Sequence, residues 1–172
     1  AEGPHHVDER RDLVFRAGDL DDDGLLAHVD DLGAEDVRDF EQLGAASGIP
    51  LASGENLCFA TQFEAMLDAG AVQYAQPSVT KVGGVTEFLK VMALAGARNV
   101  RLAPHSPYYG PGALATLHLL AAYGEPSWFE YFYLWPDAKL FGASLDPING
   151  ALEVPSGPGL GCDPDPGVVD RY

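Results

Sequence analysis

The sequence predicts an α/β fold in which about four βα units form one half of a TIM-type (β/α) barrel, behind an irregular acidic N-terminal segment. Short apolar stretches that end in polar residues alternate with helical patterns of about 10–15 residues, and this alternation is typical of a parallel sheet. The polar residues that close these stretches recur at intervals of 23, 27 and 25 residues. Residues 1–41 differ from the rest because they carry a net charge of −10 and show weak hydrophobic periodicity.

The predicted strands and helices follow one another from residue 49 onward. Strands are expected at 49–56, 72–79, 100–106 and 128–134, because each is a short apolar run bounded by turn residues. Helices are expected between and after them, at 61–71, 85–98 and 113–124. In the first of these helices Thr61 and Glu64 form a T-x-x-E capping box, and Gly70 ends the helix.

We divide the chain at residue 45. Residues 1–45 are predicted to be an acidic segment of uncertain structure, with a short amphipathic helix near its end that includes Val37 and Phe40. Residues 46–172 are predicted to be the half-barrel and its tail, which is irregular from Pro136 onward. A half-barrel leaves two unpaired strand edges, so residues 1–45, a second copy or the rest of a larger chain are expected to cover them.

The charge of the chain excludes several classes of partner. Twenty-six acidic residues against ten basic ones give a net charge of −16 and an isoelectric point near 4.3. Such a surface repels phosphate backbones and anionic lipid, so we expect no nucleic-acid binding and no membrane association. A salt-adapted host and a GC-rich genome both account for the many Asp and few Lys residues.

The two cysteines and the hydropathy bound the compartment. Cys58 and Cys162 form no C-x-x-C pair, which argues against a disulfide-stapled scaffold and a structural zinc site. No apolar run approaches the ~18 residues of a membrane helix, and the N-terminus lacks the apolar core of a signal peptide. A cytoplasmic protein is therefore expected.

Four polar residues close the predicted strands, namely Glu55, Ser78, His105 and Glu130. The C-terminal ends of the strands of a β/α barrel share one face, and active sites lie there. These residues are therefore expected to converge around one opening, although no two are close in the sequence. The alternative for each of them is a structural role: Glu55 as a solvated loop acid, His105 as a loop histidine bonded to backbone, and Ser78 as a turn residue.

Residues from about Ser47 to Tyr172 resemble the C-terminal half of the barrel domain in the mandelate racemase-like (mandelate racemase/muconate lactonizing enzyme) group of the enolase superfamily. The resemblance rests on SGIPLASGEN, DAGAVQYAQPSVTKVGGVTEFLKV, APHSPYYGPGALATLHL, WFEY and VPSGPGLG. It implies a Mg²⁺-assisted enzyme that removes the proton alpha to a carboxylate. The enolate intermediate then leads to racemisation or, in acid-sugar dehydratases, to loss of a β-hydroxyl group.

The resemblance also implies roles for individual residues. Glu55 in GEN is similar to a metal-binding carboxylate, and His105 in APH to the general base. Glu130 in FEY is similar to a residue that hydrogen-bonds the substrate carboxylate or the enolate. Lys81 in TKVGG occupies a position that is commonly basic and helps to set the electrostatics of the opening; its alternative is a solvent-facing turn lysine.

This chain also departs from the family's pattern. Ser78 stands where members with a histidine base usually have an Asp that orients the imidazole, and a hydroxyl supplies no charge. The family's first two metal carboxylates have no matching motif in residues 1–45, and its substrate-capping N-terminal domain is absent. Since one carboxylate cannot hold Mg²⁺ tightly, we expect an incomplete active site and a truncated form of the enzyme.

Other motifs favour structural roles. His118 lies on an apolar helix and is expected to be packed there, and the adjacent His5 and His6 offer adventitious metal affinity at best. The stretch from Asp19 to Asp30 resembles an EF-hand calcium loop, but its twelfth position is Asp rather than the usual Glu. A solvated acidic segment is the expected interpretation.

Two functions remain open at this point. The first is a truncated form of a Mg²⁺-dependent lyase or isomerase that acts on a small-molecule carboxylate such as a sugar acid. The alternative is a catalytically inactive half-barrel remnant that acts only as a structural or self-associating module. In either case we expect a homo-oligomer, or a partner that supplies the missing barrel strands.

Overall fold

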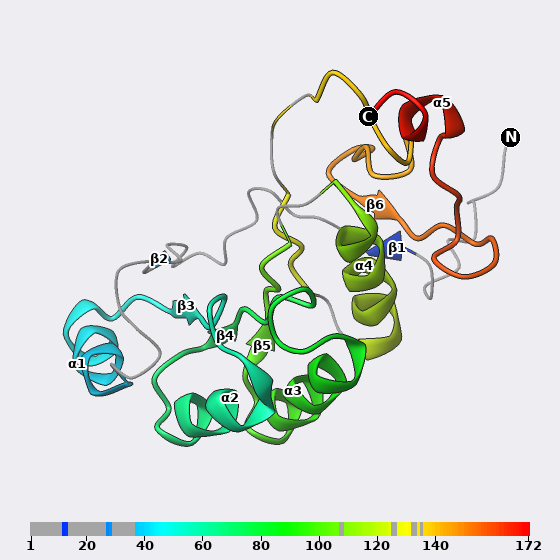
Figure 1. Cartoon of the computed structure of the whole chain (residues 1–172). Coiled ribbons are helices and arrows are strands. Elements are labelled where there is room, and N and C mark those ends of the chain that lie inside the picture. The colour runs from blue at the N-terminus through cyan, green and yellow to red at the C-terminus, as the bar shows by residue number, and fades with distance from the viewer. Residues whose placement is uncertain are drawn as a thin grey trace, which may run out of the picture.

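The structure is a computed structural model that describes residues 12–13, 27–28, 37–106, 109–124, 127–131, 134 and 136–172. Its centre is a parallel sheet in the order β2-β3-β4-β5. The strands are β2 (Ala27–His28), β3 (Leu51–Ser53), β4 (Tyr74–Ala75) and β5 (Arg101–Leu102). Each is followed by a helix: α1 (Val37–Ser47), α2 (Phe59–Asp68), α3 (Val85–Ala97) and α4 (Pro111–Tyr123) (Figure 1). The predicted α/β fold with parallel strands is confirmed.

The sheet is held in register by backbone hydrogen bonds that run past the ends of its short strands. Ala52 lies opposite Tyr74, which lies opposite Arg101. The Gln76 amide donates to the Ser53 carbonyl at 2.9 Å, and the Ala103 amide donates to the Ala75 carbonyl at 2.9 Å. The pairing therefore continues one residue beyond β4 and one beyond β5, toward the residues that were predicted to close the strands.

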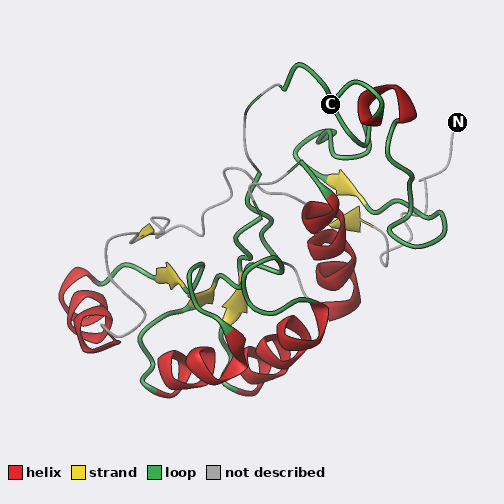
Figure 2. Ribbon diagram, in the orientation of Figure 1, coloured by secondary structure: helices red, strands yellow, loops and turns green. Residues whose placement is uncertain are grey.

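Helices α2 and α3 pack beside each other under the sheet, as Figure 2 shows. Apolar residues at intervals of three and four face inward on α3, and the four members of this set are buried: Phe88, Val91, Met92 and Ala95. Phe63 of α2 and Leu102 of β5 are fully buried in the same core. Arg98, which caps α3, forms ion pairs with Asp68 and Glu64 of α2. The helices predicted at 85–98 and 113–124 are thus confirmed within a few residues.

The prediction that a capping box at Thr61 opens α2 is wrong. The helix begins at Phe59, and Cys58 is its N-cap residue, without a capping bond from its own side chain. The amide groups at this end are satisfied by other partners. The Cys58 amide donates to Gln62 Oε1, and the Phe59 amide donates to the Val82 carbonyl at 2.9 Å. Because tertiary contacts satisfy the first turn, the helix begins two residues before the local motif.

The strand predicted at 128–134 is not formed in the described residues of that range. Trp128 donates one backbone hydrogen bond to the Leu102 carbonyl at 3.4 Å, and 127–131 otherwise lie outside the sheet. A run of aromatic residues is typical of a strand on a half-buried surface, but an extended segment without ladder bonds also provides such a surface. The other predicted strands are confirmed in place but are shorter than expected.

The two ends of the chain contain more regular structure than predicted. The segments expected to be irregular pair with each other, because β1 (Asp12–Leu13) lies antiparallel to β6 (Leu152–Glu153). A short helix, α5 (Pro166–Val169), is capped by the Asp165 side chain. Strand β2 also lies within the segment predicted to be irregular. Two-residue strands carry too little pattern to be seen in a sequence.

The predicted amphipathic helix near residue 45 is confirmed as α1. The division of the chain between residues 45 and 46 falls inside this helix, and that division stays a prediction. The histidine pair at His5 and His6 lies outside the described residues, as does the calcium-loop motif apart from Ala27 and His28. Within the part of the chain that the structure describes, no helix has the length and apolarity to cross a membrane.

Two positions, Gly54 and Gly70, require glycine for different structural reasons. Gly70 has φ +67° and ends α2, where its amide donates to Leu67 and the Ala71 amide donates to Met66, as in a Schellman motif. Nothing lies within 4 Å of a Cβ placed there. Gly54 has φ +118°, and a Cβ at that position would lie 2.6 Å from the buried Phe63 ring. Glycine is therefore required at position 54 both by the backbone conformation and by the close contact with Phe63.

Alanine substitutions separate these two reasons. Gly70→Ala is expected to lower the free energy of unfolding by about 1–2 kcal/mol, the cost of a left-handed L-residue. Gly54→Ala is expected to lower it by roughly 2–5 kcal/mol, because overpacking against Phe63 adds to the backbone term. Urea unfolding followed by circular dichroism measures both. Equal losses in the two variants would show that the Phe63 ring moves aside without cost.

Candidate functional site

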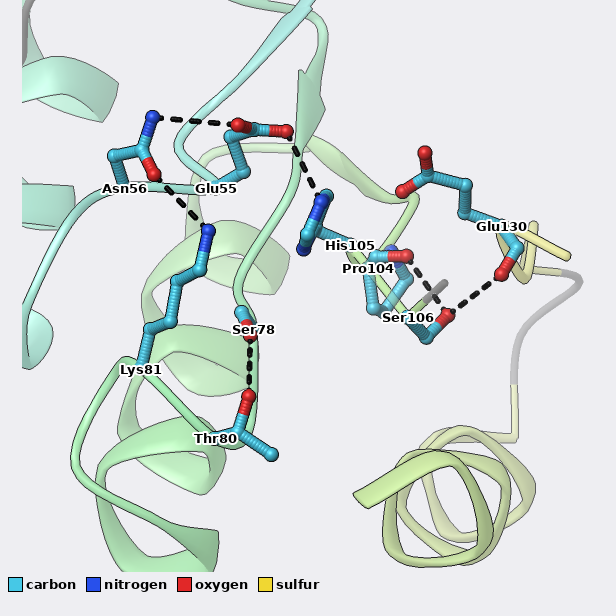
Figure 3. A network of polar contacts seen from close by, with 9 residues as sticks. All are labelled: Glu55, Asn56, Ser78, Thr80, Lys81, Pro104, His105, Ser106 and Glu130. Atoms are coloured by element: carbon cyan, nitrogen blue, oxygen red, sulfur yellow. Dashed lines mark hydrogen bonds and ion pairs between the residues drawn. The ribbon is translucent and has the colours of Figure 1, made fainter. Parts of the chain in front are cut away.

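The loops that follow β3 and β5 bring a carboxylate and an imidazole together. After β3 the chain turns at Gly54, and the Leu57 amide donates to the Gly54 carbonyl at 3.1 Å. Glu55 projects from this turn. After β5 the chain remains extended and buried through Ala103 and Pro104 to His105. His105 Nε2 lies 3.3 Å from Glu55 Oε2, with 14% of the histidine side chain and 19% of the glutamate side chain exposed (Figure 3).

Asn56 and Lys81 continue this polar group toward β4. Asn56 Nδ2 donates to Glu55 Oε1 at 3.2 Å, and Lys81 Nζ donates to Asn56 Oδ1 at 3.0 Å. The loop after β3 is thus joined to the loop after β4 through side chains. The Asn56 amide connects Lys81 to Glu55, as the dashed lines in Figure 3 show. Asn56 was not among the predicted site residues; its signal in the sequence is its position directly after Glu55 in the GEN motif.

Ser106 connects the loop after β5 to the segment that contains Glu130. Its fully buried hydroxyl lies 3.1 Å from the Pro104 carbonyl and 3.2 Å from the Glu130 carbonyl, and it donates its one proton between these two acceptors. The main chain of Glu130 is therefore held beside His105. Ser106 was not among the predicted site residues either, because a single serine in a loop carries no distinctive pattern.

The Glu130 side chain has an unusual environment. Its Oε2 atom is buried, and no donor among the described residues forms a hydrogen bond with it. Leaving a buried carboxyl oxygen without a donor is costly, so such an atom is a candidate to meet a bound ligand. Figure 3 shows the carboxyl group on the side of the loops where Glu55 and His105 lie.

Ser78 lies close to this group but points elsewhere. It is fully buried, and its Oγ lies 3.1 Å from Thr80 Oγ1. Figure 3 shows its side chain directed toward Thr80, away from the imidazole. The acidic group 3.3 Å from the imidazole is instead Glu55, which comes from β3 rather than from the strand of Ser78. His118 lies on α4, where its Nε2 is 3.0 Å from the Leu160 carbonyl.

The described residues do not by themselves fit a magnesium site. No group of three or more His, Cys, Asp or Glu side chains that could hold a metal occurs among them. Mg²⁺ prefers near-octahedral oxygen ligands. Here Glu55 supplies one carboxylate, of which Oε1 accepts from Asn56 and Oε2 faces His105. We therefore derive no chemical step through a metal.

What the described groups can do is move a proton. A neutral imidazole accepts one at its free nitrogen, and a carboxylate beside it orients the ring and stabilises the imidazolium that forms. A partly buried position strengthens that interaction relative to water. The arrangement is thus suited to general acid–base chemistry on a small molecule in front of Glu130.

Comparison with known proteins agrees with this fold. A family model described as enolase C-terminal domain-like, for the mandelate racemase/muconate lactonizing enzyme group, matches residues 17–168. The L-talarate/galactarate dehydratase of Salmonella typhimurium is 33% identical over 153 residues, which cover 88% of this chain and 36% of that enzyme. The D-galactonate dehydratase of Ralstonia pickettii is 35% identical over 147 residues, covering 79% and 38%.

Solved structures show the same similarity. The L-talarate dehydratase from Polaromonas sp. JS666, in complex with Mg and L-glucarate, aligns with a TM-score of 0.71 at 28% identity. The alignment covers 88% of this chain and 40% of that one. This chain therefore spans about two-fifths or less of the length of these relatives. With a family match over most of its residues, the chain belongs to the enolase C-terminal domain-like family, within the mandelate racemase/muconate lactonizing enzyme group of the enolase superfamily.

Proposed function

We propose that this chain forms part of the catalytic domain of a Mg²⁺-dependent lyase or isomerase that removes the proton alpha to the carboxylate of a sugar acid. The observation that carries the proposal is the contact of His105 Nε2 with Glu55 Oε2 at 3.3 Å, between the loops that follow two parallel strands. The related dehydratases named above support a sugar-acid substrate. Dehydration and racemisation share this first step.

In this proposal His105 is the base. Its imidazole takes the α-proton, and the electron pair of the C–H bond moves into the substrate carboxylate to form the enolate. Glu130 forms a hydrogen bond with the substrate carboxylate or the enolate, a role supported by its buried Oε2 atom, which lacks a partner among the described residues. In dehydration the imidazolium returns its proton to the departing β-hydroxyl, which leaves as water. Lys81 adds positive charge at the edge of the site.

The metal part of the proposal concerns Glu55. Glu55 would hold Mg²⁺ together with ligands from elsewhere, and the metal would supply positive charge next to the enolate. Glu55 offers one hard oxygen ligand, and the remaining ligands come from outside the set of described residues. The family similarity to a structure solved with Mg supports this part.

The architectural part of the proposal is that residues 46–172 are the C-terminal half of a (β/α) barrel. This range contains three of the parallel strands among the described residues, β3, β4 and β5, and β2 (Ala27–His28) precedes it; together they are half of the eight strands that such a barrel contains. Alignment with about 40% of the length of barrel-containing relatives supports it. We further propose that a second copy, or a partner, supplies strands to the open edges.

Proton abstraction is tested directly by isotope exchange. The chain is incubated in D₂O with Mg²⁺ and a panel of aldonic and aldaric acids, and the α-proton signal is followed by NMR. Loss of the signal is expected, and His105→Asn is expected to slow it by about 10²–10⁴-fold, because the base is removed. His118→Gln, which retains a donor toward Leu160, is the matched control and should exchange at the unchanged rate. An unaffected rate in His105→Asn would exclude His105 as the base.

Metal binding distinguishes the enzyme from an inactive structural module. Titration calorimetry with Mg²⁺, with and without an acid sugar, is expected to show binding heat that Glu55→Gln lowers at least about tenfold in affinity, because a charged oxygen ligand is lost. Glu64→Gln on the outer surface of α2 is the control. Absence of heat at millimolar metal, with or without the sugar, would favour the inactive half-barrel.

The assembly proposal predicts a concentration-dependent mass. Sedimentation equilibrium of the isolated chain is expected to show dimers or larger species, because unpaired parallel edges associate. A compact monomer at all concentrations tested would contradict strand exchange between copies.

A further inference from the structure

The turn that carries Glu55 is followed by the first residues of α2, which are hydrogen-bonded to α3 and to the loop before α3. Residues 54–57 form this turn, and α2 starts two residues later with Cys58 as N-cap. The first backbone amides of any helix have no partner within the helix. Here two of them are satisfied by α3 and the loop before it. The Phe59 amide donates to the Val82 carbonyl at 2.9 Å, and the Ala60 amide donates to Glu87 Oε2 at 2.9 Å.

The backbone of Phe59 adopts a strained conformation where α2 is bonded to α3 and the loop before it. Phe59 has φ +62°, a conformation that large L-residues rarely adopt, and 58% of the residue is exposed. Its exposed side chain does not compensate for the conformation through burial. Strained residues of this kind persist where the surrounding bonds fix them. The bonds on either side of Phe59 are the ones to Val82 and Glu87.

The Glu87 side chain is held at the N-terminus of α2 by burial and by hydrogen bonds to both carboxylate oxygens. Its side chain is 18% exposed, and Oε1 accepts a hydrogen bond from Lys90 Nζ while Oε2 accepts from Ala60. A Cβ at Gly83, where φ is +111°, would lie 3.0 Å from Glu87 Cγ, so the loop passes directly over this side chain. An anion at the N-terminus of α2 also interacts favourably with the helix dipole.

The charge of Glu87 agrees with this contact. The hydrogen bond from Lys90, followed by that from the Ala60 amide, holds the pKa of Glu87 below its ordinary value, against the opposite effect of burial. From the packed helix α2 the Ala60 amide donates to this carboxylate, while the acidic residues Glu64 and Asp68 pair with Arg98. Stability from the contact is therefore present at neutral pH and is lost as the pH falls through the lowered pKa.

We propose that Glu87 is a positioning residue, which caps α2 from α3 and thereby holds Glu55 and Asn56 of the adjoining turn against His105 and Lys81. Its consequence for catalysis rests on the proposed function, but the positioning itself does not. Only four residues separate Glu55 from Ala60, whose amide Glu87 caps. A shift of the Ala60 amide is therefore passed along a short stretch of backbone to Glu55. Release of that amide frees the turn at its C-terminal side.

The test compares variants of the full chain by NMR and hydrogen exchange. Glu87→Ala is expected to raise the exchange rate of the Ala60 amide at least tenfold and to shift the resonances of the Asn56 side-chain amide and the His105 ring. Glu87→Gln retains an oxygen acceptor and should restore all three. Glu64→Ala, which removes another glutamate contact between α2 and α3, should leave them unchanged. If Glu87→Ala does not fold, Glu87→Asp shortens the side chain by one methylene and serves in its place.

A pH series adds a second readout. The Ala60 amide shift should follow the protonation of Glu87, with a midpoint below the ordinary value of a glutamate, and Glu87→Gln should abolish this movement. A variant that loses Ala60 protection while Asn56 and His105 keep their resonances would overturn the proposal, because Glu87 would then cap the helix without positioning the site. Failure of the proposed function is separate, since it appears as absent α-proton exchange in the unmodified chain.

Discussion

The backbone hydrogen bonds between β3, β4 and β5 determine where each polar side chain leaves the sheet. They continue beyond the short strands, to Gln76 on Ser53 and to Ala103 on Ala75. The loops after β3 and β5 therefore start at the same edge, although β4 lies between them. Without this parallel register Glu55 and His105, fifty residues apart in the sequence, have no reason to meet.

A second layer of contacts converts this proximity into a defined geometry. Gly54 lets the chain turn over Phe63, the Ser106 hydroxyl holds the main chain of Glu130, and Asn56 connects Glu55 to Lys81. These contacts come from residues that do no chemistry themselves. Sites whose supporting side chains are fixed in this way lose less entropy when a ligand binds. The fold thus fixes the orientation of the polar side chains, and the family similarity indicates which chemistry to expect of them.

Much of the fold could be predicted because local patterns were strong. The spacing of Phe88, Val91 and Met92 on α3 specified a buried helical face, and Gly70 specified a helix end. The prediction of a strand at 128–134 was wrong because a run of aromatic residues indicates a half-buried surface, whether or not ladder bonds form. Strands of two residues, such as β2, lay below what any periodicity can reveal.

The sequence by itself determined the alternation of β3, β4 and β5 with helices, the positions of Glu55 and His105 after two of these strands, and the family, since these depend on patterns within a few residues and on motifs such as GEN and APH. Only the tertiary structure decided which groups face each other. It paired His105 with Glu55, directed Ser78 toward Thr80, and recruited Glu87 to cap α2. The physical reason is that side-chain partners depend on packing between elements distant in the chain, which no local pattern encodes.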